Sequence, residues 1–211
     1  MSKQQLQVKQ LTCIRGDRRL FSDLSFALQA GQLLHLKGRN GTGKTTLQRS
    51  LGGLFEPDAG EIRWGGQSIG DLGESYYQDV LYLGHAAGIK LDFTPLENLR
   101  TLCGLRGLSV SEDKLWQALQ KLGLRGFEDL PARMLSAGQK RRIALARLFV
   151  DPAKLWILDE PFTALDVAAV DLLRALLVGH LDVGGMVVLT THQAVDLPGE
   201  RMTTITLGEA V

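Results

Sequence analysis

The 211-residue sequence predicts an α/β fold with a β-rich N-terminal part and a helical subdomain inserted into the core. Short apolar runs typical of buried parallel strands recur along the chain, and helical patterns separate them. From about residue 92 to 150 no strand-like run is present, and helix signals follow one another. We therefore expect one domain over residues 1–211, with the helical subdomain at about 92–150. The expected core strands lie at 33–36, 80–83, 155–158, 186–189 and 205–207.

The N-terminal part contains the patterns of short strands. Leu6, Val8 and Leu11 roughly alternate with polar residues, and a second apolar segment follows at 24–28. The run at 33–36 is short, apolar and followed by a glycine, as expected for a buried parallel strand. A helix is then expected to begin near Thr45.

Three helix starts are marked in the middle of the chain. Thr94 to Glu97 combines an N-cap residue, a proline at the first helical position and a capping-box glutamate. Ser111 precedes two acidic residues and an apolar stripe with helical spacing, and Gly123 can end this helix. Ser136 to Gln139 forms another capping box, and Asp151-Pro152 must stop the helix that it opens.

Composition excludes several classes of protein. The formal charge is +1, whereas coating a nucleic acid requires a strong surplus of lysine and arginine. The two cysteines, Cys13 and Cys103, have neither the number nor the spacing of a disulfide framework or zinc site, which favours a reducing cytosol. The start lacks a signal-peptide pattern, and the apolar stretch from Leu172 to Thr191 is interrupted by charged residues. A membrane role would therefore require a partner chain.

A phosphate-binding loop is the strongest motif. Its pattern, G-x-x-x-x-G-K-[ST], stands between an apolar strand and an expected helix, where the mechanism requires it. Glycines let backbone N–H groups surround phosphate oxygens, Lys44 reaches the β- and γ-phosphates, and Thr45 offers a hydroxyl to Mg²⁺. The predicted nucleotide-binding residues here are Gly38, Arg39, Asn40, Gly41, Thr42, Gly43, Lys44, Thr45 and Thr46.

Two adjacent carboxylates follow the apolar strand at 155–158. They are expected at the carboxyl edge of the sheet, where open α/β folds bind ligands. Asp159 is predicted to hold Mg²⁺, mainly through a water, and Glu160 to polarise the water that attacks the γ-phosphate. Solvated acids before a turn are the alternative interpretation, and the phosphate loop favours the catalytic one.

The segment from Leu135 to Gln139 distinguishes among nucleotide-binding families. One interpretation is a capped amphipathic helix, and another is a second anion site at a helix N-terminus. Leu-Ser-Ala-Gly-Gln resembles the signature segment of ABC transporter ATP-binding subunits, usually Leu-Ser-Gly-Gly-Gln, and the resemblance covers almost the whole chain. It implies a P-loop NTPase core of the ABC ATPase type that binds ATP with Mg²⁺, with Ser136, Gly138 and Gln139 contacting nucleotide.

The resemblance assigns three further residues. Asp166 stands in the segment that matches the family's D-loop, and His192 stands where the family has a histidine that contacts the γ-phosphate. A neutral imidazole can both donate and accept there, so His192 is a catalytic candidate beside Glu160. His85 stands where most members have a glutamine, which leaves its contact with the metal open because imidazole suits softer metals than Mg²⁺.

Two other features have competing interpretations. The family usually stacks adenine on an aromatic residue, but Ile14-Arg15-Gly16 occupies that place, so Arg15 or Phe21 could substitute. The basic segment from Lys140 to Arg142 is interpreted as a solvated or partner-facing patch. No nucleic-acid partner is expected.

The resemblance also implies an assembly and a role. The single set of motifs implies a head-to-tail pair with a second copy of the chain. The length suits an ATPase subunit served by separate integral membrane subunits, peripheral on the cytoplasmic face of the inner membrane. Residues 82–90 and 94–99 are similar to the ATP-binding subunits of bacterial cytochrome c maturation systems. This family couples ATP hydrolysis to haem export or release of haem-loaded chaperone. A transporter for another cargo and a soluble regulatory ATPase are the alternatives.

Overall fold

The computed structural model describes residues 5–193 and 201–208, which form two compact units. Residues 1–4, on which the expectation about a signal peptide partly rests, lie outside the described residues. One unit contains two sheets and comprises residues 1–82, 153–159 and 177–211; the other is mainly helical and comprises 83–152 and 160–176. Among the described helices, none has the length and apolarity to cross a membrane.

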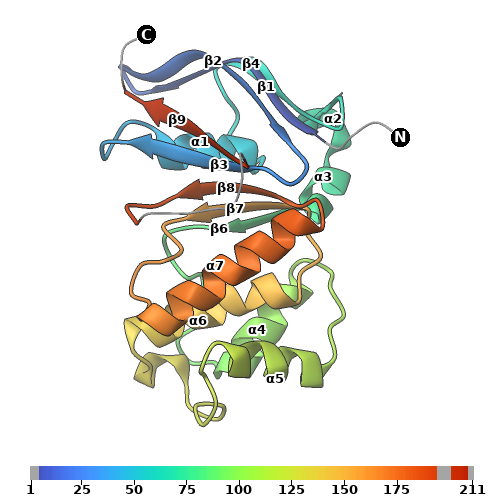
Figure 1. The fold of residues 1–211 in the computed structure, drawn as a ribbon, viewed down its shortest axis with the longest axis vertical. Helices are drawn as coiled ribbons and strands as arrows, with labels where there is room; N and C mark the ends of the chain where they lie inside the picture. Colours follow the sequence, from blue (N-terminus) through green and yellow to red (C-terminus); the bar gives the residue numbers. More distant parts are fainter. Residues whose placement is uncertain (1–4, 194–200, 209–211) are drawn as a thin grey trace. The chain divides into compact units, whose positions relative to one another are not determined.

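The first unit contains the five-stranded sheet that the apolar runs predict (Figure 1). Its strand order is β6-β7-β8-β3-β9, and the pairs β7-β8, β8-β3 and β3-β9 are parallel. The inner strands are buried because both faces of a parallel sheet are covered. The strands are β3 (Leu33–Gly38), β6 (Val80–Leu83), β7 (Leu155–Asp159), β8 (Met186–Thr190) and β9 (Met202–Leu207).

A four-stranded antiparallel sheet, in the order β2-β1-β4-β5, forms the rest of the β structure. Two of its strands are long, where the sequence indicates several short ones. The reason is irregular pairing: register shifts interrupt the alternation, and Gln10 and Asp23 adopt positive φ angles of 49° and 53°. The strands are β1 (Gln5–Arg15), β2 (Arg18–Gln29), β4 (Ala59–Trp64) and β5 (Gln67–Ser68).

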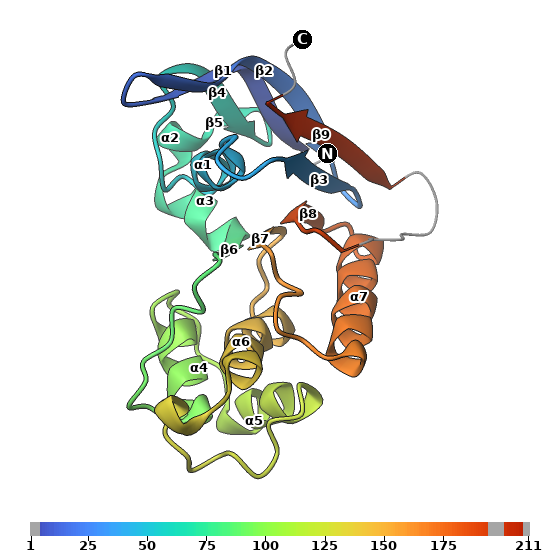
Figure 2. The same cartoon turned by 90° about the vertical axis from the view of Figure 1, so that its left-hand side faces the viewer.

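One hydrophobic core joins the two sheets of this unit. Helix α1 (Lys44–Leu51) lies between them, as Figures 1 and 2 show, and buries Leu47 and Leu51. Leu34 and Leu36 of β3 face the same core. Since successive strand residues point to opposite faces, His35 points to the other face of the sheet. Two short helices, α2 (Ile69–Leu72) and α3 (Glu74–Asp79), complete the segment before β6.

The helical unit has the starts that the sequence marks. Capping boxes are present at Thr94, which opens α4 (Pro95–Gly104), and at Ser136, which opens α6 (Ala137–Leu145). Helix α5 (Glu112–Lys121) follows Ser111, and its leucine stripe is buried. A 3₁₀ turn continues α6 as far as Phe149, before Asp151-Pro152. Helix α7 (Val167–Asp182) begins in this unit and ends in the first.

Candidate functional site

The loop from Gly38 to Thr45 connects β3 to α1 and has the backbone of an anion cradle. Gly38, Gly41 and Gly43 have φ angles of 140°, 79° and 101°, which favour glycine. A Cβ atom on Gly38 would lie 2.6 Å from the carbonyl oxygen of Leu207. The loop therefore requires glycine here both for its turn and for its close approach to β9.

The cradle ends at the N-terminus of α1, where the helix dipole adds positive potential. The Nζ atom of Lys44 donates to the carbonyl oxygens of Gly38, at 2.7 Å, and Arg39, at 3.1 Å. The Thr42 hydroxyl donates to Arg39, at 2.9 Å. These bonds fold the lysine over the loop, so its charge lies where phosphate oxygens would bind.

Asp159, at the end of β7, meets the start of α1. Its side chain is buried, and its Oδ2 accepts a hydrogen bond from the Thr45 hydroxyl at 3.1 Å. Its Oδ1 accepts from the Thr190 hydroxyl at 2.7 Å. Both carboxylate oxygens are therefore held in place, and one of them lies beside the hydroxyl that the sequence predicts as a metal ligand.

This donor set fits Mg²⁺, a hard cation that prefers oxygen ligands and keeps several waters. Thr45 and Asp159 supply a hydroxyl and a carboxylate next to the phosphate cradle. Among the described residues there is no cluster of three or more His, Cys, Asp or Glu that could hold a metal without other ligands. Phosphate and water oxygens would have to complete the coordination.

His192 lies in the same unit as the loop. It is exposed and follows β8, which is the neighbour of β3 in the sheet. The residue before it, Thr191, is buried, and the Thr191 hydroxyl accepts a hydrogen bond from the backbone N–H of Gln193 at 3.0 Å. The structure thus places His192 just beyond the carboxyl end of a central strand, at the same sheet edge as Asp159.

The helical unit brings together a second group of predicted residues. The Ser136 hydroxyl accepts from the backbone N–H of Gln139 at 3.2 Å, and the Gln139 side chain accepts from the Ser136 N–H at 2.8 Å. A Cβ atom on Gly138 would lie 2.5 Å from the carbonyl oxygen of Ala164. The first turn of α6 therefore packs directly on the segment that carries Asp166.

Asp166 caps α7. Its Oδ1 accepts from the backbone N–H of Ala169 at 3.0 Å, and its Oδ2 pairs with Arg142 at 2.7 Å. The backbone hydrogen bond, followed by the arginine, lowers the pKa of the Asp166 carboxyl below its usual value. The carboxylate is therefore ionised at neutral pH, and both of its oxygens are engaged within the helical unit.

Glu160 occupies a strained backbone position. Its φ angle is 48°, in the left-handed region that non-glycine residues rarely adopt. Its carbonyl oxygen accepts hydrogen bonds from Nη2 of Arg141, at 3.1 Å, and from the N–H of Thr163, at 3.2 Å. These contacts hold the backbone that aims the candidate catalytic carboxylate.

The interpretation of Lys140, Arg141 and Arg142 as a solvated or partner-facing patch is wrong for Arg141, which is buried. Arg141 is only 6% exposed, and its guanidinium also donates to the carbonyl oxygens of Gly84, at 2.8 Å, and His85, at 3.3 Å. Arg142 donates to Leu122 and pairs with Asp166. Sequence reasoning missed this because burial of an arginine depends on distant backbone carbonyls, which no local pattern marks.

We expect Arg141→Ala to destabilise the protein by about 2–3 kcal/mol, since it removes charge-assisted hydrogen bonds to three carbonyl oxygens. Urea unfolding followed by circular dichroism measures this. Lys140→Ala, one position earlier on α6, is the matched control and should change stability by less than about 0.5 kcal/mol. Equal stability of the two variants would contradict the bridging role.

His85 is exposed and contributes its backbone carbonyl to Arg141. The two candidates for adenine stacking differ in exposure, because Phe21 is buried and Arg15 is exposed. Phe21 is 9% exposed and belongs to the core beneath the loop, where its ring would be 3.2 Å from a Cβ atom on Gly43. The Arg15 guanidinium lies 4.9 Å from the centre of the Phe55 ring. Phe21 therefore supports the loop rather than forming a base platform.

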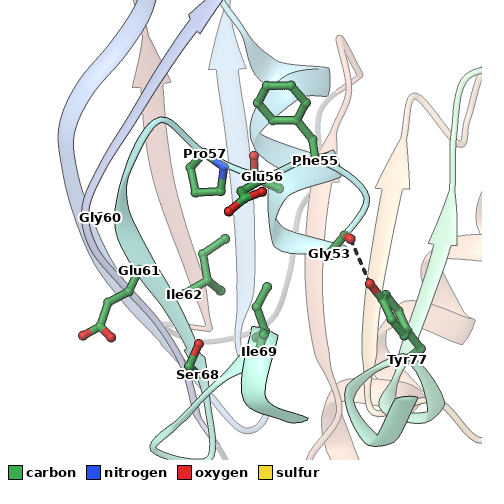
Figure 3. Close-up of a pocket in the computed structure, with 12 residues that line it drawn as sticks. Gly53, Phe55, Glu56, Pro57, Gly60, Glu61, Ile62, Ser68, Ile69 and Tyr77 are labelled. Carbon is green, nitrogen blue, oxygen red and sulfur yellow. Dashed lines mark hydrogen bonds between the residues drawn. The ribbon is translucent and has the colours of Figure 1, made fainter. Parts of the chain in front are cut away.

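A cavity of about 420 Å³ lies elsewhere in the first unit (Figure 3). Its wall includes Phe55, Ile62 and Ile69, and the Tyr77 hydroxyl donates to Gly53 O at 3.0 Å across one end. None of the catalytic, nucleotide-binding or metal-binding residues predicted from the sequence lines this cavity. The loop geometry, rather than this cavity, therefore identifies the candidate site.

Two curated relatives match nearly the whole chain. The chain is 53% identical over 203 residues to the cytochrome c biogenesis ATP-binding export protein CcmA of Dechloromonas aromatica, covering 96% of this chain and all of the relative. The corresponding protein of Methylococcus capsulatus is 54% identical over 95% of this chain and 97% of its own length.

Solved structures show the same fold. A dimeric post-hydrolysis state of the ATP-binding cassette MJ0796, bound to ADP and Pi, superposes with a TM-score of 0.80. The match covers 96% of both chains at 22% identity. The profile of the ABC transporter family matches residues 21–163, which is more than half of the sequence. The chain therefore belongs to the ABC transporter family, as a relative of the cytochrome c biogenesis ATP-binding export proteins.

Proposed function

We propose that the chain is the ATP-hydrolysing subunit of a membrane ABC complex in c-type cytochrome biogenesis, coupling ATP hydrolysis to haem export or to release of haem-loaded chaperone. The observation that carries the ATPase activity is the contact between Thr45 and Asp159 beside the glycine cradle. The biological role is supported by the names of relatives that match over nearly the full chain.

Each of the candidate residues has a distinct role in the proposed hydrolysis. Backbone N–H groups of the loop and the Lys44 ammonium bind the β- and γ-phosphates. Thr45 and Asp159 would hold Mg²⁺, which neutralises charge on the phosphate oxygens when bound. Glu160 accepts a hydrogen bond from the attacking water and takes up its proton, while His192 orients the γ-phosphate and this water.

A second copy of the chain completes the site in this proposal. The N-terminus of α6, with Ser136, Gly138 and Gln139, has backbone donors suited to the γ-phosphate bound by the partner. A head-to-tail pair then encloses two nucleotides, and ATP stabilises the closed state because it contacts both chains. Asp166 lies beside this element and serves the same interface.

Integral membrane subunits would convert opening and closing of the pair into transport, with this chain attached peripherally at the cytoplasmic face of the inner membrane. In this proposal a helix of these subunits docks on the segment from His85 to Leu99, so the departure of His85 from glutamine concerns coupling more than the metal. The protein takes no nucleic acid in this scheme, consistent with its formal charge of +1.

The test is a pull-down of the tagged chain from its native membrane in mild detergent, with haem measured by absorbance. We expect integral membrane subunits and a haem-loaded chaperone with wild type, and more of the complex with Glu160→Gln because hydrolysis no longer opens it. Recovery of a different permease without haem would indicate a different cargo, while the chain would still be the ATPase subunit of a transporter. Recovery of a soluble monomer would overturn the membrane role.

A further inference from the structure

His35 is a buried polar residue for which the proposed mechanism has no role. It is 5% exposed and lies in the middle of β3, the strand that leads into the phosphate loop. In the parallel pairing it stands opposite Leu189 of β8. Burying an imidazole costs free energy unless its nitrogens are hydrogen-bonded, so its partners indicate what it does.

One ring nitrogen bonds just beyond the end of the neighbouring strand. Nε2 of His35 lies 3.2 Å from the carbonyl oxygen of Thr191. Because a carbonyl oxygen can only accept, Nε2 carries the hydrogen in this bond. The paired register of β3 and β8 ends at Leu36 and Thr190, so the Thr191 carbonyl is one residue past the ladder. The histidine thus supplies a donor to buried backbone that the sheet has left.

The proposed mechanism of ATP hydrolysis uses the residues around this carbonyl. Thr190 precedes it and donates its hydroxyl to Oδ1 of Asp159, while His192 follows it directly. A movement of Thr191 would therefore displace His192 and disturb the bond that orients Asp159. The hydrogen bond between His35 and Thr191 connects β3, which leads into the phosphate loop, to the end of β8, which His192 follows. Both strands lie in one compact unit.

We propose that His35 is a positioning residue, which fixes the Thr191 peptide so that His192 and Asp159 keep their places relative to the phosphate loop. This inference rests on the proposed ATPase function. It assigns His35 no contact with nucleotide, and its effect should fall on turnover rather than on binding.

Two variants separate the hydrogen bond from the packing. His35→Phe keeps a ring but loses the donor, whereas His35→Gln loses the ring but keeps an amide N–H the same number of bonds from Cα. We expect kcat of the Phe variant to fall about tenfold with KM within about twofold, the pattern of lost geometry in the transition state. The Gln variant should recover most of the loss.

A second readout does not depend on hydrolysis. In the nucleotide-free protein, amide hydrogen exchange in peptides containing Thr191 to Gln193 should accelerate in the Phe variant and stay near wild type in the Gln variant. His180→Phe is the matched control in the same unit: this histidine stacks on Trp156 at 3.7 Å and bonds the backbone at Lys154 and Met186, at the starts of β7 and β8 rather than at their Asp159 and Thr190 ends. It should change neither kcat nor this exchange. If the His35→Phe variant melts below the assay temperature, His35→Met takes its place, since methionine adapts to irregular space.

Equal losses in the Phe and Gln variants would show that His35 only fills volume and would overturn the proposal, as would wild-type turnover and exchange in both. Failure of the proposed function has a different signature. Hydrolysis would then be unaffected by Glu160→Gln, while the exchange difference between the two His35 variants would persist.

Discussion

Glu160→Gln is expected to slow ATP hydrolysis by about 10²- to 10⁴-fold, the range supplied by a positioned general base. The amide has the same shape as the carboxylate, but it has no negative charge and cannot take up the proton of the attacking water. Nucleotide affinity should stay close to wild type, because the loop amides, Lys44 and Thr45 are unchanged. Phosphate release in single-turnover assays, with binding of a fluorescent ATP analogue in parallel, measures both.

A second consequence of the same change is a longer-lived ATP-bound pair, visible by size-exclusion chromatography in ATP. Asp113→Asn is the control, since it amidates an exposed carboxylate on α5 of the helical unit. It should leave turnover and association unchanged. Turnover of Glu160→Gln within about threefold of wild type would remove Glu160 from the role of general base. Another carboxylate would then have to be sought.

The conformation of the loop between β3 and α1 could be predicted from the sequence because the pattern that determines it is local. A cradle of backbone N–H groups needs glycines at fixed spacing, and the structure gives Gly38, Gly41 and Gly43 positive φ angles. The two capping boxes were predictable for the same reason, since Thr94 and Ser136 bond residues only three positions away. The Thr45–Asp159 contact joins residues 114 positions apart and followed from the expected sheet edge.

Residues whose roles depend on distant partners were missed or misread. Arg141 reads as part of a basic surface run, although three carbonyl oxygens from two other segments bury it. His35 reads as one polar residue in an apolar strand, and its partner lies 156 residues away. Neither pairing leaves a signal in spacing or periodicity, so only the folded chain reveals it.

The strands also differ in how well the sequence predicts them. The apolar parallel strands stand out because burial on both faces makes each run continuous. Strand β4 was missed because Gly60, Glu61 and Arg63 interrupt it, and its core face consists of Ile62 and Trp64. Its identity depends on antiparallel pairing with β1, a property of the sheet rather than of the segment.

Lys44→Ala is expected to lower the affinity for nucleotide rather than the rate of the hydrolytic step. The ammonium donates to Gly38 and Arg39 of its own loop, and so lies above the cradle formed by the amides. Truncation of a charged partner in a desolvated pair costs about 2–5 kcal/mol. At about 3 kcal/mol, nucleotide affinity falls roughly a hundredfold, measurable by isothermal titration with ATP and Mg²⁺.

Lys37→Ala is the matched control for this loss. Lys37 is exposed near the end of β3, so its removal changes net charge equally but takes no donor from the loop. Its affinity should stay within about threefold of wild type at physiological salt, because screened surface charges contribute little. Similar losses in both variants would mean that general attraction, not a placed ammonium, binds the phosphates. A loss confined to Lys44→Ala, with an unchanged melting temperature, assigns the affinity to the position of Nζ above the loop.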